Sequence, residues 1–110
     1  MELITAVIQP FMLERLTRLL RKQKIGGYTV TQVNGSGQDL INSPEYMQPR
    51  VKVEIAVNPE QLDVICELIH KTVSTHQEGD GILFVTPISR VINLATGARD
   101  SLALSVEDKN

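Results

Sequence analysis

Apolar residues recur along the chain with two different periods, and the shorter period predicts the strands. Residues 3–8 form a β-rich apolar run, as expected for a strand buried on both faces. Residues 28–33 are rich in β-branched side chains, and residues 51–57 alternate apolar with mostly polar side chains, so each segment predicts a strand. Residues 82–86 predict a fourth strand, and we expect a short fifth one at residues 91–94.

The longer, helical period predicts two helices. Residues 11–24 place Leu13, Leu16 and Leu20 on one face, after a proline that suits a first helical turn. The second helix starts after Asn58, because Asn is a good N-cap and Gln61 is placed to reach back to it. Its apolar positions continue to residue 73. The order β-α-β-β-α-β predicts an α+β, ferredoxin-like sandwich, with both helices on one face of an antiparallel sheet.

Composition restricts the class of protein. The chain has 110 residues, which fits one domain, and its net charge is −2, which argues against a general nucleic-acid binder. Aromatic residues make up 4% of the chain, too few for the stacking surface of an RNA-binding sheet. No apolar run has the ~20 residues of a membrane span, and no segment looks like a signal peptide. We therefore expect a cytoplasmic protein.

The sequence does not contain a convincing catalytic or metal-binding constellation. No nucleophile stands in a known catalytic context, so we expect a protein that is not an enzyme. Cys66 and His70 are four residues apart and would share a helix face, with His76 beyond. Structural zinc needs four ligands, so Cys66 as a small core residue is the better interpretation, and we expect no metal.

Two glycine-containing segments are the best candidates for ligand binding. Gly35 and Gly37 follow the second strand and open a long loop, and Gly79 and Gly81 flank Asp80 before the fourth strand. Glycine lets a backbone approach a ligand, and successive N–H groups form anion-binding nests. Each segment alone is more often a plain turn. Together, and beside a long loop, they favour a ligand cleft.

Several blocks of residues, in one order, resemble the PII nitrogen-signalling family. These are residues 1–11 (MELITAVIQPF), 27–37 (GYTVTQVNGSG), 49–55 (PRVKVEI), 79–88 (GDGILFVTPI), the Val-Ile pair at 91–92 and the Thr-Gly pair at 96–97. Together they cover about the first 97 residues. The resemblance implies a PII-like domain at residues 1–97 and a tail at 98–110, either loosely ordered or packed on another subunit.

The resemblance also implies a function. PII proteins are homotrimers that bind ATP or ADP between subunits, often with 2-oxoglutarate and magnesium. A T-loop, here residues 37–50, docks on enzymes, transcription regulators or membrane transporters, and a B-loop, here residues 75–81, holds phosphates. The implied effector-binding residues are Gly35, Gly37, Gln38, Arg50, Gly79, Asp80 and Gly81. The implied partner-binding loop residues are Asp39, Asn42, Glu45 and Tyr46.

The chain departs from the family pattern where phosphate would be held. Two B-loop lysines are replaced by Gln77 and Ile82, and two later arginines by Asn93 and Ala95, whereas Arg50 is retained. A charged contact contributes roughly 1.5–3 kcal/mol, so these losses predict weaker binding of a triphosphate. We expect an effector that is an adenine nucleotide such as ATP or ADP, bound more weakly, or another small anion. The alternatives are a trimeric interaction protein that needs no ligand and a metal-handling protein of the same fold.

Overall fold

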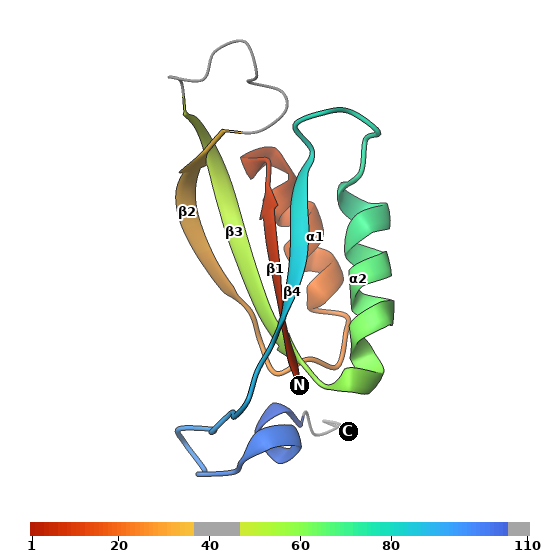
Figure 1. Cartoon of the computed structure of the whole chain (residues 1–110). Helices are drawn as coiled ribbons and strands as arrows, with labels where there is room; N and C mark the ends of the chain where they lie inside the picture. Colours follow the sequence, from red (N-terminus) through yellow and green to blue (C-terminus); the bar gives the residue numbers. More distant parts are fainter. Residues whose placement is uncertain (37–46, 106–110) are drawn as a thin grey trace.

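The computed structural model describes residues 1–36 and 47–105, and its sheet has the predicted ferredoxin-like arrangement (Figure 1). Four antiparallel strands lie in the order β2-β3-β1-β4. Their bounds are Glu2–Ile8 for β1, Thr29–Gly35 for β2, Gln48–Val57 for β3 and Gly81–Pro87 for β4. The four predicted strands are confirmed, and no strand end moves by more than three residues. A split β-α-β topology explains this order, because each helix returns the chain to a non-adjacent position.

The two helices differ in how well their ends were predicted. Helix α2 spans Pro59–Val73 and begins as expected, with the Asn58 N–H donating to Gln61 Oε1 at 3.0 Å. Helix α1 spans only Leu13–Leu20, after a short 3-10 helix, η1, at Pro10–Met12. The prediction of one helix over residues 11–24 is therefore wrong at both ends. Tight i to i−3 hydrogen bonds at 3.0 Å, such as Lys22 N–H to Leu19 O, end α1 early.

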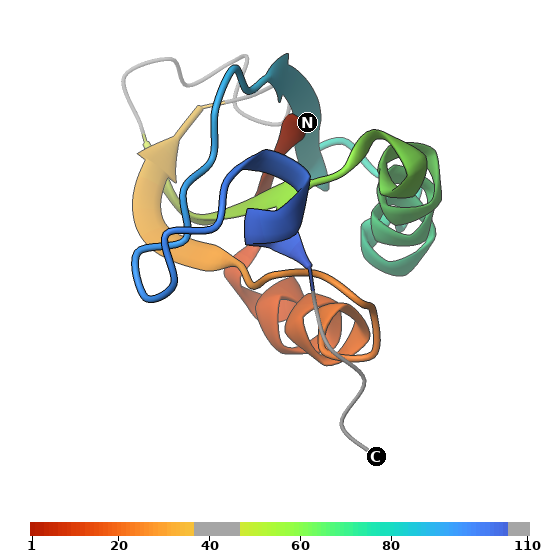
Figure 2. The same cartoon turned by 90° about the horizontal axis from the view of Figure 1, so that it is seen from below.

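The core lies between the sheet and the helices. Alternate residues of β1 and β3 face it, as their antiparallel register requires: Ala6 pairs with Val53 and Ile4 with Ile55. Leucines of α1 and isoleucines of α2 close it from the other side: Leu16, Leu20, Ile65 and Ile69. Figures 1 and 2 show both helices against the same face of the sheet. The described segments contain no helix that meets the length and hydropathy needed to cross a bilayer.

The segment after β4 departs most from the sequence predictions. The expected strand at residues 91–94 does not form, and Ile92 makes only an isolated bridge with Arg99. The side chain of Asn93 accepts the N–H groups of Ala95 and Thr96, which turns the chain back before a ladder can grow. A 3-10 helix, η3, then spans Asp100–Leu104, and Figure 2 shows it across the lower end of the sheet. The buried side chain of its last residue packs over Gly26.

Candidate functional site

The described candidate residues gather at one end of the sheet (Figure 1). Gly35 ends β2 opposite Gln48, and Ile8 ends β1 opposite both Val51 and Gly81. Since β3 and β1 separate β2 from β4, strand spacing alone puts Gly35 and Gly81 at least about 14 Å apart, and Gly35 lies three residues beyond Gln32, the β2 residue in register with Gly81. The fold therefore places both glycine-containing segments at the same end but not in contact. Six predicted residues, Gly37, Gln38, Asp39, Asn42, Glu45 and Tyr46, lie outside the described part of the chain.

The turn formed by residues 75–81 is organised by the carboxylate of Asp80. Oδ1 accepts the Thr75 hydroxyl at 2.5 Å, and Oδ2 accepts the Thr75 N–H at 2.7 Å and the Gln77 N–H at 3.3 Å. The Thr75 hydroxyl, followed by backbone N–H donors, lowers the pKa of Asp80. As an ionised acceptor, this side chain holds the turn together and does not itself donate to a bound anion.

Backbone geometry fixes the same turn. Gly79 has φ +92° and Gly81 has φ +127°, values that L side chains rarely adopt. A Cβ atom on Gly81 would lie 2.1 Å from the carbonyl oxygen of Val7, so only glycine fits there. A residue that the sequence did not suggest, Gln9, ties the turn to β1 by donating Nε2–H to Gly79 O at 2.7 Å. The only sequence signal for Gln9 is its place directly after β1.

The turn leaves donors available for a ligand. Within the described part of the chain, the N–H groups of Glu78 and Gly79 have no acceptor. Adjacent free N–H groups beside a glycine with positive φ suit an anion such as a phosphate oxygen. The backbone could thus supply hydrogen bonds to an anion without any charged side chain.

Arg50, the one cation predicted at this end, is buried at the start of β3. Its Nη1 donates to Pro49 O at 2.9 Å, and its Cγ lies 3.5 Å from where a Cβ on Gly35 would stand. The guanidinium thus lies beside the end of β2, with Gln32 and Asn34 lining the same hollow of about 420 Å³. Arg50 and Asp80 line two different hollows in the single chain.

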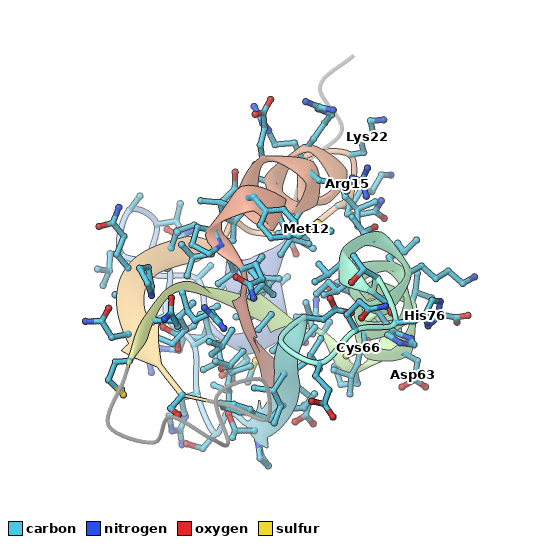
Figure 3. All side chains as sticks on the ribbon, turned by 90° about the horizontal axis from the view of Figure 1, so that it is seen from above. Met12, Arg15, Lys22, Asp63, Cys66 and His76 are labelled. Carbon is cyan, nitrogen blue, oxygen red and sulfur yellow. The ribbon has the colours of Figure 1, made fainter. Side chains whose placement is uncertain are left out.

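The hollow beside the turn is largely apolar. It measures about 390 Å³ and lies between α2 and the strands β1 and β4, with Cys66, His70 and Gln77 among its lining residues. Burial raises the pKa of the Cys66 thiol, and the charge of Asp63 raises it further, so the thiol stays protonated and is a poor metal ligand. Figure 3 labels Cys66 on α2 and His76 on the turn. No three His, Cys, Asp or Glu side chains in residues 1–36 and 47–105 form a metal-binding group.

Comparisons with known proteins decide the family. A family model described as "Nitrogen regulatory protein P-II" matches residues 1–98. "Nitrogen regulatory protein GlnK" of Escherichia coli (strain K12) is 38% identical over 112 residues, covering 94% of this chain and 100% of that protein. "Nitrogen regulatory protein P-II" of Klebsiella oxytoca and "Nitrogen regulatory protein P-II 1" of Escherichia coli (strain K12) have the same identity and coverage. The chain belongs to the P-II family.

Membership confirms the resemblance and the class of function predicted from the sequence. The chain is a PII-like signal-transduction regulator of the nitrogen-regulatory type, and P-II proteins are regulatory and non-catalytic. The family binds adenine nucleotides in general and acts on protein targets as trimers.

The turn of this P-II protein lacks the cations that the family pattern places there. Gln77 is exposed and neutral, and Ile82 stands 62% exposed at the start of β4, where the pattern has lysine. Glu78 and Asp80 give the turn two carboxylates. Asn93, in the place of an arginine, is used to form the turn at residues 93–97. The turn of this chain therefore keeps backbone N–H donors, but its ionised side chains are both acidic.

Proposed function

We propose that this protein is a trimeric regulator that binds a small effector between subunits and controls a protein target through residues 37–50. The face of the sheet away from the helices supports the trimer. On that face Ile82 is 62% and Phe84 47% exposed, with half-buried Leu3 and Val7 on neighbouring β1. An apolar sheet face that the chain's own helices do not cover favours burial against another copy.

The effector in this proposal lies over the 75–81 turn. The N–H groups of Glu78 and Gly79 donate to one terminal phosphate or carboxylate, and Arg50 of the T-loop base supplies positive charge from the other side of the sheet end. Since Glu78 adds repulsion, each further phosphate gains less than in a lysine-bearing turn. The effector is accordingly an adenine nucleotide for which ATP and ADP gain little affinity over AMP.

The output in this proposal passes through the T-loop, to which Asp39, Asn42, Glu45 and Tyr46 belong. The target is a protein, for which the family offers three classes: an enzyme, a transcription regulator or a membrane transporter. Residues 1–97 form the regulatory domain in this proposal. Residues 98–110 form an appended tail, whose packing over Gly26 through Leu104 ties it to the end of the sheet opposite the turn.

The observation that carries the proposal is a turn held in shape by Asp80, with two free backbone N–H groups, in a chain of the P-II family. Isothermal titration with AMP, ADP, ATP, cyclic AMP and bicarbonate tests it. We expect heat with at least AMP and a loss of that heat in Glu78→Pro, which removes one of the two N–H donors. A trimer that gives no heat with any of these would contradict effector binding and favour the ligand-independent alternative.

A separate measurement tests the assembly. Light scattering on the eluting protein should give three times the mass of 12.2 kDa. Phe84→Glu should shift the particle toward the monomer, because it places a charge on the apolar face that the trimer would bury. A matched control, Val64→Glu, lies on the outer side of α2 and is 57% exposed, so it should leave the trimer intact. A monomeric wild-type protein would overturn this part of the proposal.

A further inference from the structure

Positive charge is concentrated on one short stretch of this otherwise acidic chain. Five of its 11 Lys and Arg residues lie between residues 15 and 24, where no Asp or Glu is present. The whole chain carries a net charge of −2. In the sequence, the last three of these cations are explained by their position near a helix end, where they favour the helix dipole. Arg18 lies in the last turn of α1, so the same explanation covers it, but not Arg15, which is the third residue of the helix.

The fold turns this stretch into one side of a groove between the two helices. A hollow of about 350 Å³ is lined by residues of α1, of the turn that follows it and of the end of α2: Arg15, Arg18, Leu19, Lys22, Lys71 and Thr72. Figure 3 labels Arg15 on α1 and Lys22 near the end of that helix. Arg15 lies in α1, and Lys22 lies two residues after the helix ends at Leu20. The groove therefore has cations on its rim and the half-buried side chain of Leu19 between them.

The cations of the groove are available to a partner. Arg15 and Lys22 are exposed and have no ion pair within the described residues. Arg18 pairs with Glu14 at 2.9 Å and Lys71 with Glu67 at 3.3 Å, but each of these side chains is more than 60% exposed. Exposed i,i+4 pairs contribute only about 0.3–0.5 kcal/mol, so a partner carboxylate readily replaces them. The groove thus presents four cations against two weakly held carboxylates.

We propose that the groove between α1 and α2 is a second docking surface, which binds an acidic segment of a partner protein. Carboxylates of the segment pair with Arg15 and Lys22, and an apolar side chain between them covers Leu19. Charge complementarity of this kind speeds association and sets the orientation of the partner. The surface is on the helix side of the sheet, opposite the apolar face assigned to the trimer, and does not include the effector turn.

The shape of this surface favours a protein segment over a membrane or a nucleic acid. A helix that lies on a membrane presents large apolar residues for insertion beside its cations. Every residue of α1 with a large apolar side chain is buried or half-buried: Leu13, Leu16, Leu19 and Leu20. The one apolar residue in the groove is recessed between the cations, where a side chain reaches it and a lipid surface does not. The chain's negative net charge opposes wider contact with a nucleic acid.

Fluorescence anisotropy with a labelled synthetic peptide tests the proposal on the full chain. The probe is an amphipathic peptide with glutamates seven residues apart beside a leucine, used at about 20 mM salt so that screening is weak. We expect binding that is lost when the glutamates become glutamines. Arg15→Glu with Lys22→Glu should weaken it about tenfold or more, because both rim contacts become repulsive.

A control variant, Arg90→Glu with Arg99→Glu, changes the net charge by the same amount at two exposed arginines outside the groove. Its affinity for the peptide should remain within about twofold of wild type. The Arg15→Glu, Lys22→Glu protein should in turn bind a peptide with lysines in place of glutamates, a gain that misfolding cannot produce. The proposal would be overturned if wild type did not bind the peptide, or if both variants weakened binding equally. It would also be overturned if the groove bound phosphatidylserine vesicles or duplex DNA in preference to the peptide.

Discussion

The 75–81 turn and the α1–α2 groove are built in opposite ways. The turn owes its shape to backbone geometry and to one internal carboxylate, Asp80, and it keeps its N–H donors while lacking the cations of the family pattern. The groove owes its character to long exposed side chains on a helix surface, and its backbone is ordinary. Substitutions in the turn should therefore change stability and effector choice together. Substitutions in the groove should change binding alone.

The largest expected effect comes from the backbone of the turn. Gly81→Ala should lower the free energy of unfolding by about 3 kcal/mol, because its Cβ would meet the Val7 carbonyl oxygen and its φ is strained. Urea denaturation followed by circular dichroism measures this loss. Gly97→Ala is the matched control: φ is +77° there, but the position is open, so we expect about 1 kcal/mol from strain alone. Equal losses in the two variants would show that the contact with β1 does not constrain the turn.

Restoring the missing cations should have the next largest effect. Gln77→Lys with Ile82→Lys should tighten ATP binding by about 30-fold or more, since charge-assisted contacts contribute roughly 1.5–3 kcal/mol each. Titration calorimetry with ATP and AMP measures the change, which should be larger for ATP. Glu60→Gln with Val64→Lys adds the same charge at the start of α2, far from the turn, and should leave both affinities unchanged. An equal gain from this control would mean that only net charge matters.

The sequence predicts the elements that periodicity controls and misses those that tertiary contacts control. The four strands and the start of α2 follow from alternation and from the Asn58–Gln61 cap. The early end of α1 does not, because residues 21–24 are good helix formers and turn back only to reach β2. The 3-10 helix η3 has no periodic signal, and its buried Leu104 packs against Gly26, a residue far away in the sequence.

The candidate site shows the same division. The positive φ values of Gly79 and Gly81 show a turn that needs glycine at both positions, and their role toward a ligand stays a prediction. The role of Asp80 as an internal acceptor required the positions of Thr75 and Gln77. The basic character of α1 is visible in the sequence, but Lys71 joins it only because α2 runs alongside, so the groove required the fold.

A smaller effect, on the pH dependence of stability, should show whether the Asp80 carboxylate holds the turn together. Because hydrogen bonds lower the pKa of Asp80 below its ordinary value of 3.8, its ionised form stabilises the folded turn above that pH. That contribution should be lost as pH falls through the lowered pKa of the folded state. The thermal unfolding midpoints of wild type and Asp80→Asn should therefore differ at pH 7 and become equal at pH values below the lowered pKa of Asp80. A difference between the two midpoints that does not change with pH would mean that the carboxylate does not hold the turn through its charge.

The smallest expected effect concerns the cations of the α1–α2 groove. Arg15→Gln with Lys22→Gln should change the free energy of unfolding by less than about 0.5 kcal/mol, because both side chains are exposed and unpaired within the described residues. Denaturant unfolding measures it, with Leu16→Ala as the contrast: that side chain is fully buried on the same helix, and its loss should cost about 2–5 kcal/mol. A destabilisation by the glutamine pair as large as that of Leu16→Ala would mean that these cations are part of the fold. In that case the groove would no longer be a surface whose charges are free to serve a partner.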